Sequence, residues 1–189
     1  MSWTESGPKL LVFAGPNGSG KSTITQGIPQ VGLYVNADDL KAMEGCSSLE
    51  AAQKAEAIRE HLLKTRRDFT FETVLSTPRN LDLLRRAKEA GYQISAVYVL
   101  TRSSGINVQR VRARAAAGGH DVPLDKIKSR YHRSLANLPQ LARLADQLRV
   151  VDNSDDDPKL LCTVTHRTAE IFPNEHWTKE RILLLLNEP

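Results

Sequence analysis

Long apolar runs are missing from this 189-residue sequence, and cysteine and aromatic residues are scarce. No apolar run approaches the roughly 18 residues that a transmembrane helix needs, which argues against a membrane protein. The two cysteines, Cys46 and Cys162, are too few for a disulfide framework, and neither they nor the five histidines show zinc-ligand spacing. The first residues lack a basic segment followed by an apolar stretch, so we expect a cytoplasmic protein.

Aromatic residues make up only 5% of the chain, which bears on the arginines that cluster between Arg102 and Arg133. Proteins that bind single-stranded nucleic acid stack bases on aromatic rings, and such rings are not interleaved with these arginines as stacking platforms. The formal charge of +4 suits a phosphorylated small substrate as well as a polymer. We therefore do not expect a nucleic-acid partner, and the arginines need another explanation.

The remaining composition is that of an ordinary globular protein. Hydrophobic residues are 40% of the chain and charged residues 25%, which disfavours wholesale disorder. A length of 189 residues fits one domain with a sizeable core, so we expect a single domain over residues 1–189.

Short apolar segments alternate with helical patterns along the whole chain, which indicates a parallel α/β sheet. The predicted strands are 10–14, 33–36, 69–74, 94–100 and 148–152. The predicted helices are 21–28, 49–66, 78–90, 104–117 and 123–146, the last interrupted by Pro139. Residues 160–166 can add an edge strand, and 178–187 a terminal helix.

A Walker A pattern follows the first predicted strand and opens the first predicted helix. Its residues are Gly15, Pro16, Asn17, Gly18, Ser19, Gly20, Lys21 and Ser22, with Thr23 next on the helix. The glycines let successive backbone amides turn toward one anion, and the helix N-terminus adds its positive dipole end. Lys21 is expected to reach the β and γ phosphates and Ser22 to ligate magnesium. The pattern predicts binding of a nucleoside triphosphate.

Acidic residues stand at the ends of the second and third predicted strands, where the crevice of an open parallel sheet lies. Asp38 can accept the proton of a substrate hydroxyl or orient it in line with the γ phosphate. The alternative is an N-cap for the helix that follows, for which Asp39 is an equally good candidate. Glu72, followed by Thr73, can hold magnesium through water or bind substrate hydroxyls, or it is a surface residue at a strand end.

These motifs together resemble the zeta toxin family of P-loop kinases, including its small stand-alone chromosomal members. The resemblance rests on the Walker A pattern, on Val35-Asn36-Ala37-Asp38 and on Glu72-Thr73. Further matches lie between Asn107 and Leu138: Arg110, Gly118-Gly119-His120, Val122-Pro123, Tyr131 and Ser134-Leu135-Ala136-Asn137-Leu138. The resemblance covers about residues 9–153. It implies a P-loop kinase fold with a five-stranded parallel sheet in the order 2-3-1-4-5 and a helical lid that carries arginines over about residues 104–135.

The family's best-characterised activity is ATP-dependent phosphorylation of an amino-sugar hydroxyl of UDP-N-acetylglucosamine, and some relatives act on other acceptors. The resemblance therefore implies a kinase that uses ATP and Mg²⁺, a small-molecule phosphoryl acceptor and an antitoxin protein as partner. It gives Asp38 the place of the catalytic base and Lys21 that of the Walker lysine. Glu56 falls where the family has a carboxylate that holds the sugar nucleotide, and Glu72 and Thr73 are assigned to substrate. The alternative for Glu56 is a charge at the solvated margin of its helix.

The arginine-rich segment predicts a lid, because phosphoryl transfer spreads negative charge that arginines can neutralise. Arg110 and Arg114 share one helix face while Arg112 points elsewhere, so we assign catalytic roles to the first two. His120 stands where several family members have arginine, and we assign it to substrate binding. Arg114 or Arg130 can then supply the second lid arginine. The alternative is a solvated basic helix face.

Asp152, Asn153 and Ser154 follow the last parallel strand, where similar kinases place a loop beside the adenine, so we assign Asn153 to nucleotide binding. The residues at 155–157 fit a polar turn before Pro158, and we predict no metal site there. Two other functions stay open beside the small-molecule kinase. One is a polynucleotide end kinase, and the other is a nucleotide-dependent ATPase or binding module that a partner regulates.

Overall fold

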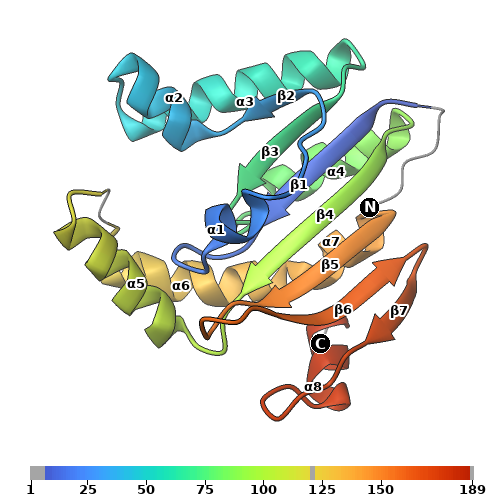
Figure 1. The fold of residues 1–189 in the computed structure, drawn as a ribbon. Coiled ribbons are helices and arrows are strands. Elements are labelled where there is room, and N and C mark those ends of the chain that lie inside the picture. Colours follow the sequence, from blue (N-terminus) through green and yellow to red (C-terminus); the bar gives the residue numbers. More distant parts are fainter. Residues whose placement is uncertain (1–6, 120–121, 188–189) are drawn as a thin grey trace.

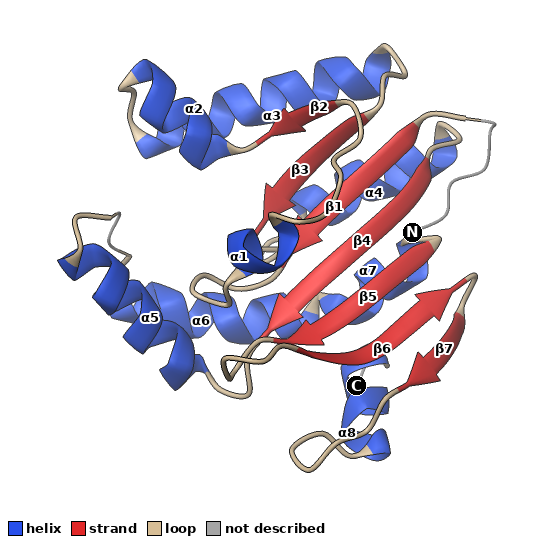
Figure 2. Cartoon of the chain, viewed as in Figure 1, coloured by secondary structure: helices blue, strands red, loops and turns tan. Residues whose placement is uncertain are grey.

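The computed structural model describes residues 7–119 and 122–187, and a seven-stranded sheet forms its centre. The strands are β1 (Lys9–Ala14), β2 (Leu33–Val35), β3 (Phe69–Thr73), β4 (Gln93–Leu100), β5 (Gln147–Asp152), β6 (Lys159–Thr165) and β7 (Thr168–Ile171). They lie in the order β2-β3-β1-β4-β5-β6-β7. The first five are parallel to one another, while β6 pairs antiparallel with both β5 and β7 (Figure 2). The predicted order of the parallel strands is therefore confirmed.

Helices cover the two faces of the sheet unequally. They are α1 (Lys21–Thr25), α2 (Ala37–Glu44), α3 (Ser48–Lys64), α4 (Arg79–Glu89), α5 (Ser104–Ala116), α6 (Leu124–Ala136), α7 (Leu138–Leu144) and α8 (Lys179–Leu186). Figure 1 shows α1 in front of the sheet and α4 and α7 behind it. The larger core lies behind, where Leu84 and Leu141 pack with strand residues such as Val12. A smaller cluster in front packs Ile24 of α1 on Phe13 and Val99.

Two sequence-based expectations about the elements need correction. The sheet has seven strands and not five, because β6 and the short strand β7 extend it beyond β5. The predicted helix over 123–146 is two helices that meet at Asn137, since Pro139 begins the first turn of α7 and lacks the N–H that would continue α6. The edge strand near 160–166 and the terminal helix near 178–187 are present as β6 and α8. Over the ranges described, none of the helices is both long and apolar enough to pass through a bilayer.

The functional end of the sheet is the edge where the parallel strands terminate. The strands β1, β3, β4 and β5 point toward α1 and α5 in Figure 1, so the segments that follow them meet there. Parallel strands bring their carboxyl ends to one edge, which is the usual place for a ligand in such a sheet. The phosphate loop after β1, Glu72 at the end of β3, α5 after β4 and Asn153 after β5 are all at this edge.

The segment before α8 secures the last parallel strand through a buried polar contact. The Nε1 of Trp177 donates a hydrogen bond of 2.7 Å to the Oδ2 of Asp152, and both residues are buried. The other carboxylate oxygen, Oδ1, accepts from the backbone N of Ser154 at 3.0 Å. The indole thus satisfies an acceptor that water cannot reach.

We expect Trp177→Phe to lower the free energy of unfolding by about 2 kcal/mol, because it leaves a buried carboxylate oxygen without its donor. Urea unfolding followed by circular dichroism measures the change. The neighbouring exposed side chain gives the control, since His176→Ala is expected to shift stability by less than about 0.5 kcal/mol. A Trp177→Phe variant as stable as the His176→Ala control would contradict the importance of this contact.

Candidate active site

The Walker A residues form a loop that joins β1 to α1 and is fixed at its base by the neighbouring strand. The backbone N of Gly15 donates to the carbonyl O of Thr73 at 3.2 Å, which ties the loop to the end of β3. Lys21 is the first residue of α1, and Gly20 caps the helix in a left-handed conformation with φ 82°. The predicted strand, loop and helix are therefore all present.

Lys21 lies in the middle of the site, among both predicted carboxylates and one lid arginine. Its Nζ donates to the carbonyl O of Gly15 at 2.8 Å and to that of Pro16 at 3.3 Å. Removal from water lowers the pKa of Lys21, the charges of Glu72 and Asp38 act in the opposite direction, and Arg114 adds to the lowering. The ammonium group therefore interacts electrostatically with residues from three different segments of the chain.

Asp38 lies in the first turn of α2, and the helix cap is the residue before it. The side chain of Asn36 accepts a hydrogen bond of 3.0 Å from the backbone N of Asp38, so Asn36 is the N-cap. Neither Asp38 nor Asp39 fills that position, which removes the capping alternative for both. Both side chains are exposed, and Asp38 is the one whose charge acts on Lys21.

Glu72 is held by a tyrosine that the sequence analysis did not single out. The phenol of Tyr34 on β2 donates to the Oε1 of Glu72 at 2.6 Å, and the Nδ2 of Asn36 lies 3.4 Å from the same phenol oxygen. Burial first, and then the hydrogen bond to Glu72, raise the pKa of the Tyr34 phenol, which keeps it a donor. Tyr34 therefore fixes the carboxylate of Glu72 beside the phosphate loop.

We expect Tyr34→Phe to lower the rate of phosphoryl transfer about tenfold, because Glu72 would lose the donor that orients it. Tyr92 gives a matched control: its phenol donates to the carbonyl O atoms of Leu62 at 3.0 Å and Arg67 at 2.9 Å, on α3 and the turn after it. Tyr92→Phe is expected to cost about 1 kcal/mol of stability and to leave the rate unchanged. Equal rates for the two variants in a steady-state assay would show that Tyr34 has no positioning role.

Thr73 and Glu56 are engaged by other protein groups. The buried hydroxyl of Thr73 accepts from the backbone N of Leu75 at 2.9 Å and from the Nδ2 of Asn80 at 2.7 Å. The Oε2 of Glu56 on α3 accepts from the Nη1 of Arg79 at 2.9 Å, and its side chain is 35% exposed. Thr73 is thus placed to shape the strand end, and Glu56 links α3 to α4. Their assignment to substrate remains a prediction.

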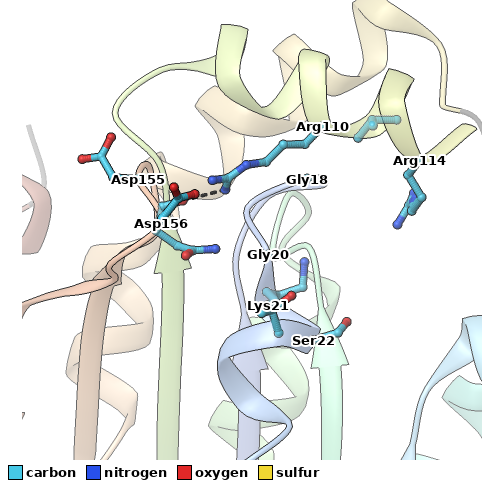
Figure 3. Close-up of a pocket in the computed structure, with 11 residues that line it drawn as sticks. Gly18, Gly20, Lys21, Ser22, Arg110, Arg114, Asp155 and Asp156 are labelled. Atoms are coloured by element: carbon cyan, nitrogen blue, oxygen red, sulfur yellow. Dashed lines mark hydrogen bonds between the residues drawn. The ribbon is translucent and has the colours of Figure 1, made fainter. Parts of the chain in front are cut away.

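The two lid arginines lie above the phosphate loop, as Figure 3 shows. The guanidinium of Arg110 donates from Nη1 to the carbonyl O of Asn153 at 2.6 Å and from Nη2 to that of Ser154 at 3.1 Å. Arg114 lines the same cavity, whereas neither Arg112 nor Arg130 does. Of the two candidates for the second lid arginine, the geometry therefore favours Arg114. The predicted site residue His120 lies outside the described residues.

A cavity of about 500 Å³ opens between the phosphate loop, α5 and the segment after β5. Its lining residues are Gly18, Gly20, Lys21, Ser22, Thr23, Arg110, Val111, Arg114, Asn153, Asp155 and Asp156. The volume is in the range of pockets that hold small molecules and cofactors. Asp155 and Asp156 belong to this wall, although the sequence suggested only a polar turn. The Nη2 of Arg102 holds Asp155 at 2.6 Å.

The residues of the cavity suit a magnesium ion that is held mainly by a nucleotide. Mg²⁺ prefers oxygen ligands and keeps several waters, so that one or two protein oxygens beside phosphates are enough. Ser22 presents an exposed hydroxyl at the start of α1, with Asp38 and Glu72 near the same ammonium group. Within residues 7–119 and 122–187, no three histidine, cysteine or acidic side chains gather as a metal cluster.

Three solved structures share this fold. The complex of AvrRxo1-ORF1 with ORF2 and ATP superposes with a TM-score of 0.72 at 16% identity, covering 88% of this chain and 61% of that one. The PezAT chromosomal toxin-antitoxin system of Streptococcus pneumoniae gives 0.53 at 16% identity, covering 86% and 73%. The Pnkp1/Rnl/Hen1 RNA repair complex gives 0.54 at 26% identity, covering 69% and 45%. The chain thus spans less than two thirds of the first of these proteins.

Two sequence comparisons agree with the structural ones. An uncharacterised protein of Haemophilus influenzae is 29% identical over 130 residues, which is 65% of this chain and 92% of that protein. The family model of the zeta toxin matches residues 28–160, which is more than half of the chain. The resemblance seen in the motifs is therefore confirmed, and the chain belongs to the zeta toxin family.

Proposed function

We propose that this protein is a kinase that transfers the γ-phosphoryl group of ATP to a hydroxyl of a small metabolite. The observation that carries the proposal is the surroundings of Lys21, where the phosphate loop meets the charges of Glu72, Asp38 and Arg114. Phosphoryl transfer requires a cation that binds the phosphates, a carboxylate that acts on the acceptor hydroxyl, and arginines that neutralise the charge that develops on the moving group. The ATP in the AvrRxo1-ORF1 complex supports ATP as the donor.

The phosphate loop holds the donor in this proposal. Its backbone amides and the N-terminus of α1 bind the phosphates, with Thr23 beside them. Lys21 moves from the carbonyl groups of Gly15 and Pro16 to the β and γ phosphates when these arrive. Ser22 would hold Mg²⁺, which neutralises the charge between the two phosphates when it is bound.

The carboxylates and the lid arginines act on the acceptor and the moving group. Asp38, exposed at the start of α2, accepts the proton of the attacking hydroxyl or orients it. Glu72, fixed by Tyr34, binds the acceptor, or it would help to hold Mg²⁺ through water when that ion is bound. Arg110 and Arg114 cover the cavity from α5 and neutralise charge as the phosphoryl group moves.

Membership of the zeta toxin family supports a nucleotide-sugar such as UDP-N-acetylglucosamine as the acceptor. Phosphorus NMR of the protein with magnesium-ATP and this sugar tests it, beside Lys21→Ala and a sample without acceptor. A phosphomonoester signal that needs both Lys21 and the sugar is the expected result. If ADP forms equally without any acceptor and no such signal appears, this sugar is not a substrate, and other acceptors are tested before the partner-regulated ATPase is preferred.

The likeness to the RNA repair complex favours a polynucleotide end kinase as the second candidate. An oligonucleotide with a 5′ hydroxyl, offered as acceptor in the same assay, separates the two. Transfer to the oligonucleotide that weakens steeply with added salt would support the second candidate, because salt competes for phosphate contacts. Transfer to the sugar alone would exclude it.

A protein partner also belongs to the proposal. The PezAT structure is named as a toxin-antitoxin system, which supports an antitoxin for this chain. Co-expression with the protein encoded by a neighbouring gene, followed by size-exclusion chromatography, tests the partnership. A stable complex with lower transfer activity is the expected result, and independent elution with full activity would contradict it.

A further inference from the structure

Two asparagine side chains donate hydrogen bonds to backbone carbonyl groups of the phosphate loop. The Nδ2 of Asn107 on α5 donates to the carbonyl O of Asn17 at 2.6 Å. The Nδ2 of Asn153, after β5, donates to the carbonyl O of Ser19 at 2.8 Å. The two amides therefore bind the loop on either side of Gly18, although they are 46 residues apart in the chain, at positions 107 and 153.

The acceptors fix which way each amide points. A backbone carbonyl only accepts hydrogen bonds, so the nitrogen of each amide must face the loop. Behind Asn107, the Oγ1 of Thr101 donates to its Oδ1, and the phenol of Tyr131 donates to the carbonyl O of Thr101 at 2.6 Å. Asn107 is fully buried and Asn153 nearly so. Burial and these hydrogen bonds therefore restrict the orientation of both amides.

Two glycines of the Walker A pattern make room for these contacts. A Cβ at Gly18 would lie 2.6 Å from the carbonyl O of Asn107, and one at Gly20 would lie 2.1 Å from the Nδ2 of Asn153. Both glycines also have positive φ, at 77° and 82°. The two glycines thus allow the backbone of α5 at Asn107 and the side-chain amide of Asn153 to approach the loop closely.

Carbonyl groups that are bound by these side chains leave the backbone N–H groups of the loop free to face a phosphate. A phosphate-binding loop works by pointing successive N–H groups at one anion. A peptide that rotated to bring the carbonyl of Asn17 or Ser19 inward would place a negative dipole where the phosphate sits. Holding these carbonyls outward prevents that rotation, and an arrangement formed in advance costs less to order on binding.

We infer that Asn107 and Asn153 are positioning residues that hold the phosphate loop in its anion-binding form. The inference rests on the proposed function, since it assumes that the loop binds a nucleotide triphosphate. It also revises the expected role of Asn153, because its side chain faces the loop and its carbonyl O accepts from Arg110. α5 therefore contacts the phosphate loop through Asn107 and the segment after β5 through Arg110, and Figure 3 shows Arg110.

The test compares ligands with and without phosphates. Isothermal titration measures magnesium-ATP and magnesium-tripolyphosphate, and saturation-transfer NMR measures adenosine. We expect Asn107→Ala and Asn153→Ala each to weaken both phosphate ligands about tenfold, which is the loss of roughly one hydrogen bond to the loop. Adenosine binding is expected to change less than about twofold, because the base does not touch the loop carbonyls.

Asn137 gives the matched control, since its Nδ2 donates to the carbonyl O of Leu75 at 2.8 Å and it does not line the cavity. Asn137→Ala is expected to lower the thermal midpoint while leaving tripolyphosphate binding unchanged. If Asn107→Ala does not fold, as circular dichroism would show, the comparison of Asn153→Ala with Asn137→Ala decides. The inference is overturned if tripolyphosphate binds the asparagine variants as it binds the unmodified protein, or if Asn137→Ala loses as much affinity. Unmodified protein that binds neither ATP nor tripolyphosphate would instead overturn the proposed function, and with it this inference.

Discussion

Lys21→Ala is expected to lower the rate of phosphoryl transfer by about a thousandfold. Removing one preorganised group that faces the developing charge costs about 10² to 10³ in rate, and Lys21 contacts both the donor's phosphates and the moving group in the proposed mechanism. Coupled measurement of ADP release and phosphorus NMR with the acceptor give the rate. The affinity for adenosine is expected to stay the same, because the ammonium group faces phosphates only.

Lys54 on the outer side of α3 is the control for loss of a lysine. It pairs with Glu44 at the surface, with roughly half of its side chain exposed. Lys54→Ala is expected to transfer phosphate at the rate of the unmodified protein. If Lys21→Ala kept more than about a tenth of the activity, the loop would not be the site of the chemistry, and the kinase proposal would fail.

Lys21→Met, which removes the charge of Lys21 but keeps most of the length of its side chain, is expected to leave the free energy of unfolding unchanged or to raise it. Burial lowers the pKa of Lys21 below 10.5, so the folded protein holds this proton less firmly than the unfolded chain does. A base with a lowered pKa in the fold opposes folding while it is protonated, and this penalty disappears as pH rises from the folded pKa toward 10.5. As pH rises through that window, the free energy of unfolding of the unmodified protein should therefore increase relative to that of Lys21→Met. Urea unfolding of both proteins at several pH values measures the difference.

The parts of the fold that the sequence predicts are those set by local patterns. The Walker A loop predicts strand, turn and helix within one short segment, and strand order follows from the P-loop kinase fold. β7 could not be predicted from local patterns, because Thr168–Ile171 is short and has no buried residue. It forms a strand because it pairs with β6. The cap of α2 needed the structure too, since Asn36 and the two aspartates after it are all good N-cap residues.

The residues that position the site were the harder part to predict. Asn107 lies in the same helix as the arginines, which were the residues that the sequence analysis singled out there. Its role depends on the packing of α5 against a loop 90 residues earlier in the chain. Tyr34 alternates with buried Val35 on β2, a pattern that indicates the opposite face of the sheet but not the register with Glu72. Both contacts are nonlocal, and periodicity carries no signal for them. The structure is needed to show which polar side chains from distant segments contact the glycine-rich loop and the carboxylate beside it.

Asp38→Asn is expected to lower the rate of transfer about a thousandfold, because the amide cannot accept the proton of the attacking hydroxyl. The substitution keeps the size of the side chain. It also keeps the start of α2, since the capping bond to Asn36 uses the backbone N of residue 38. Nucleotide affinity should change little, as Asp38 does not line the cavity beside the phosphate loop. Steady-state rates at saturating ATP and acceptor, with ADP affinity from titration, separate the two effects.

Asp39 is the matched control, since it is the next residue on the same helix turn and equally exposed. Asp39→Asn removes the same charge from the same region, and we expect its rate to stay within about twofold of the unmodified protein. The charge of Asp38 also helps to keep Lys21 protonated, so a fall in rate by itself does not distinguish a base from an electrostatic effect. The alkaline side of the pH profile does, because loss of the Asp38 charge lowers the pKa of Lys21 further and makes the rate fall earlier as pH rises, whereas loss of a base lowers the rate without moving that fall. An Asp38→Asn enzyme that transfers phosphate at the unmodified rate at lower pH and loses activity earlier on the alkaline side would show that the carboxylate acts through Lys21 and not on the acceptor.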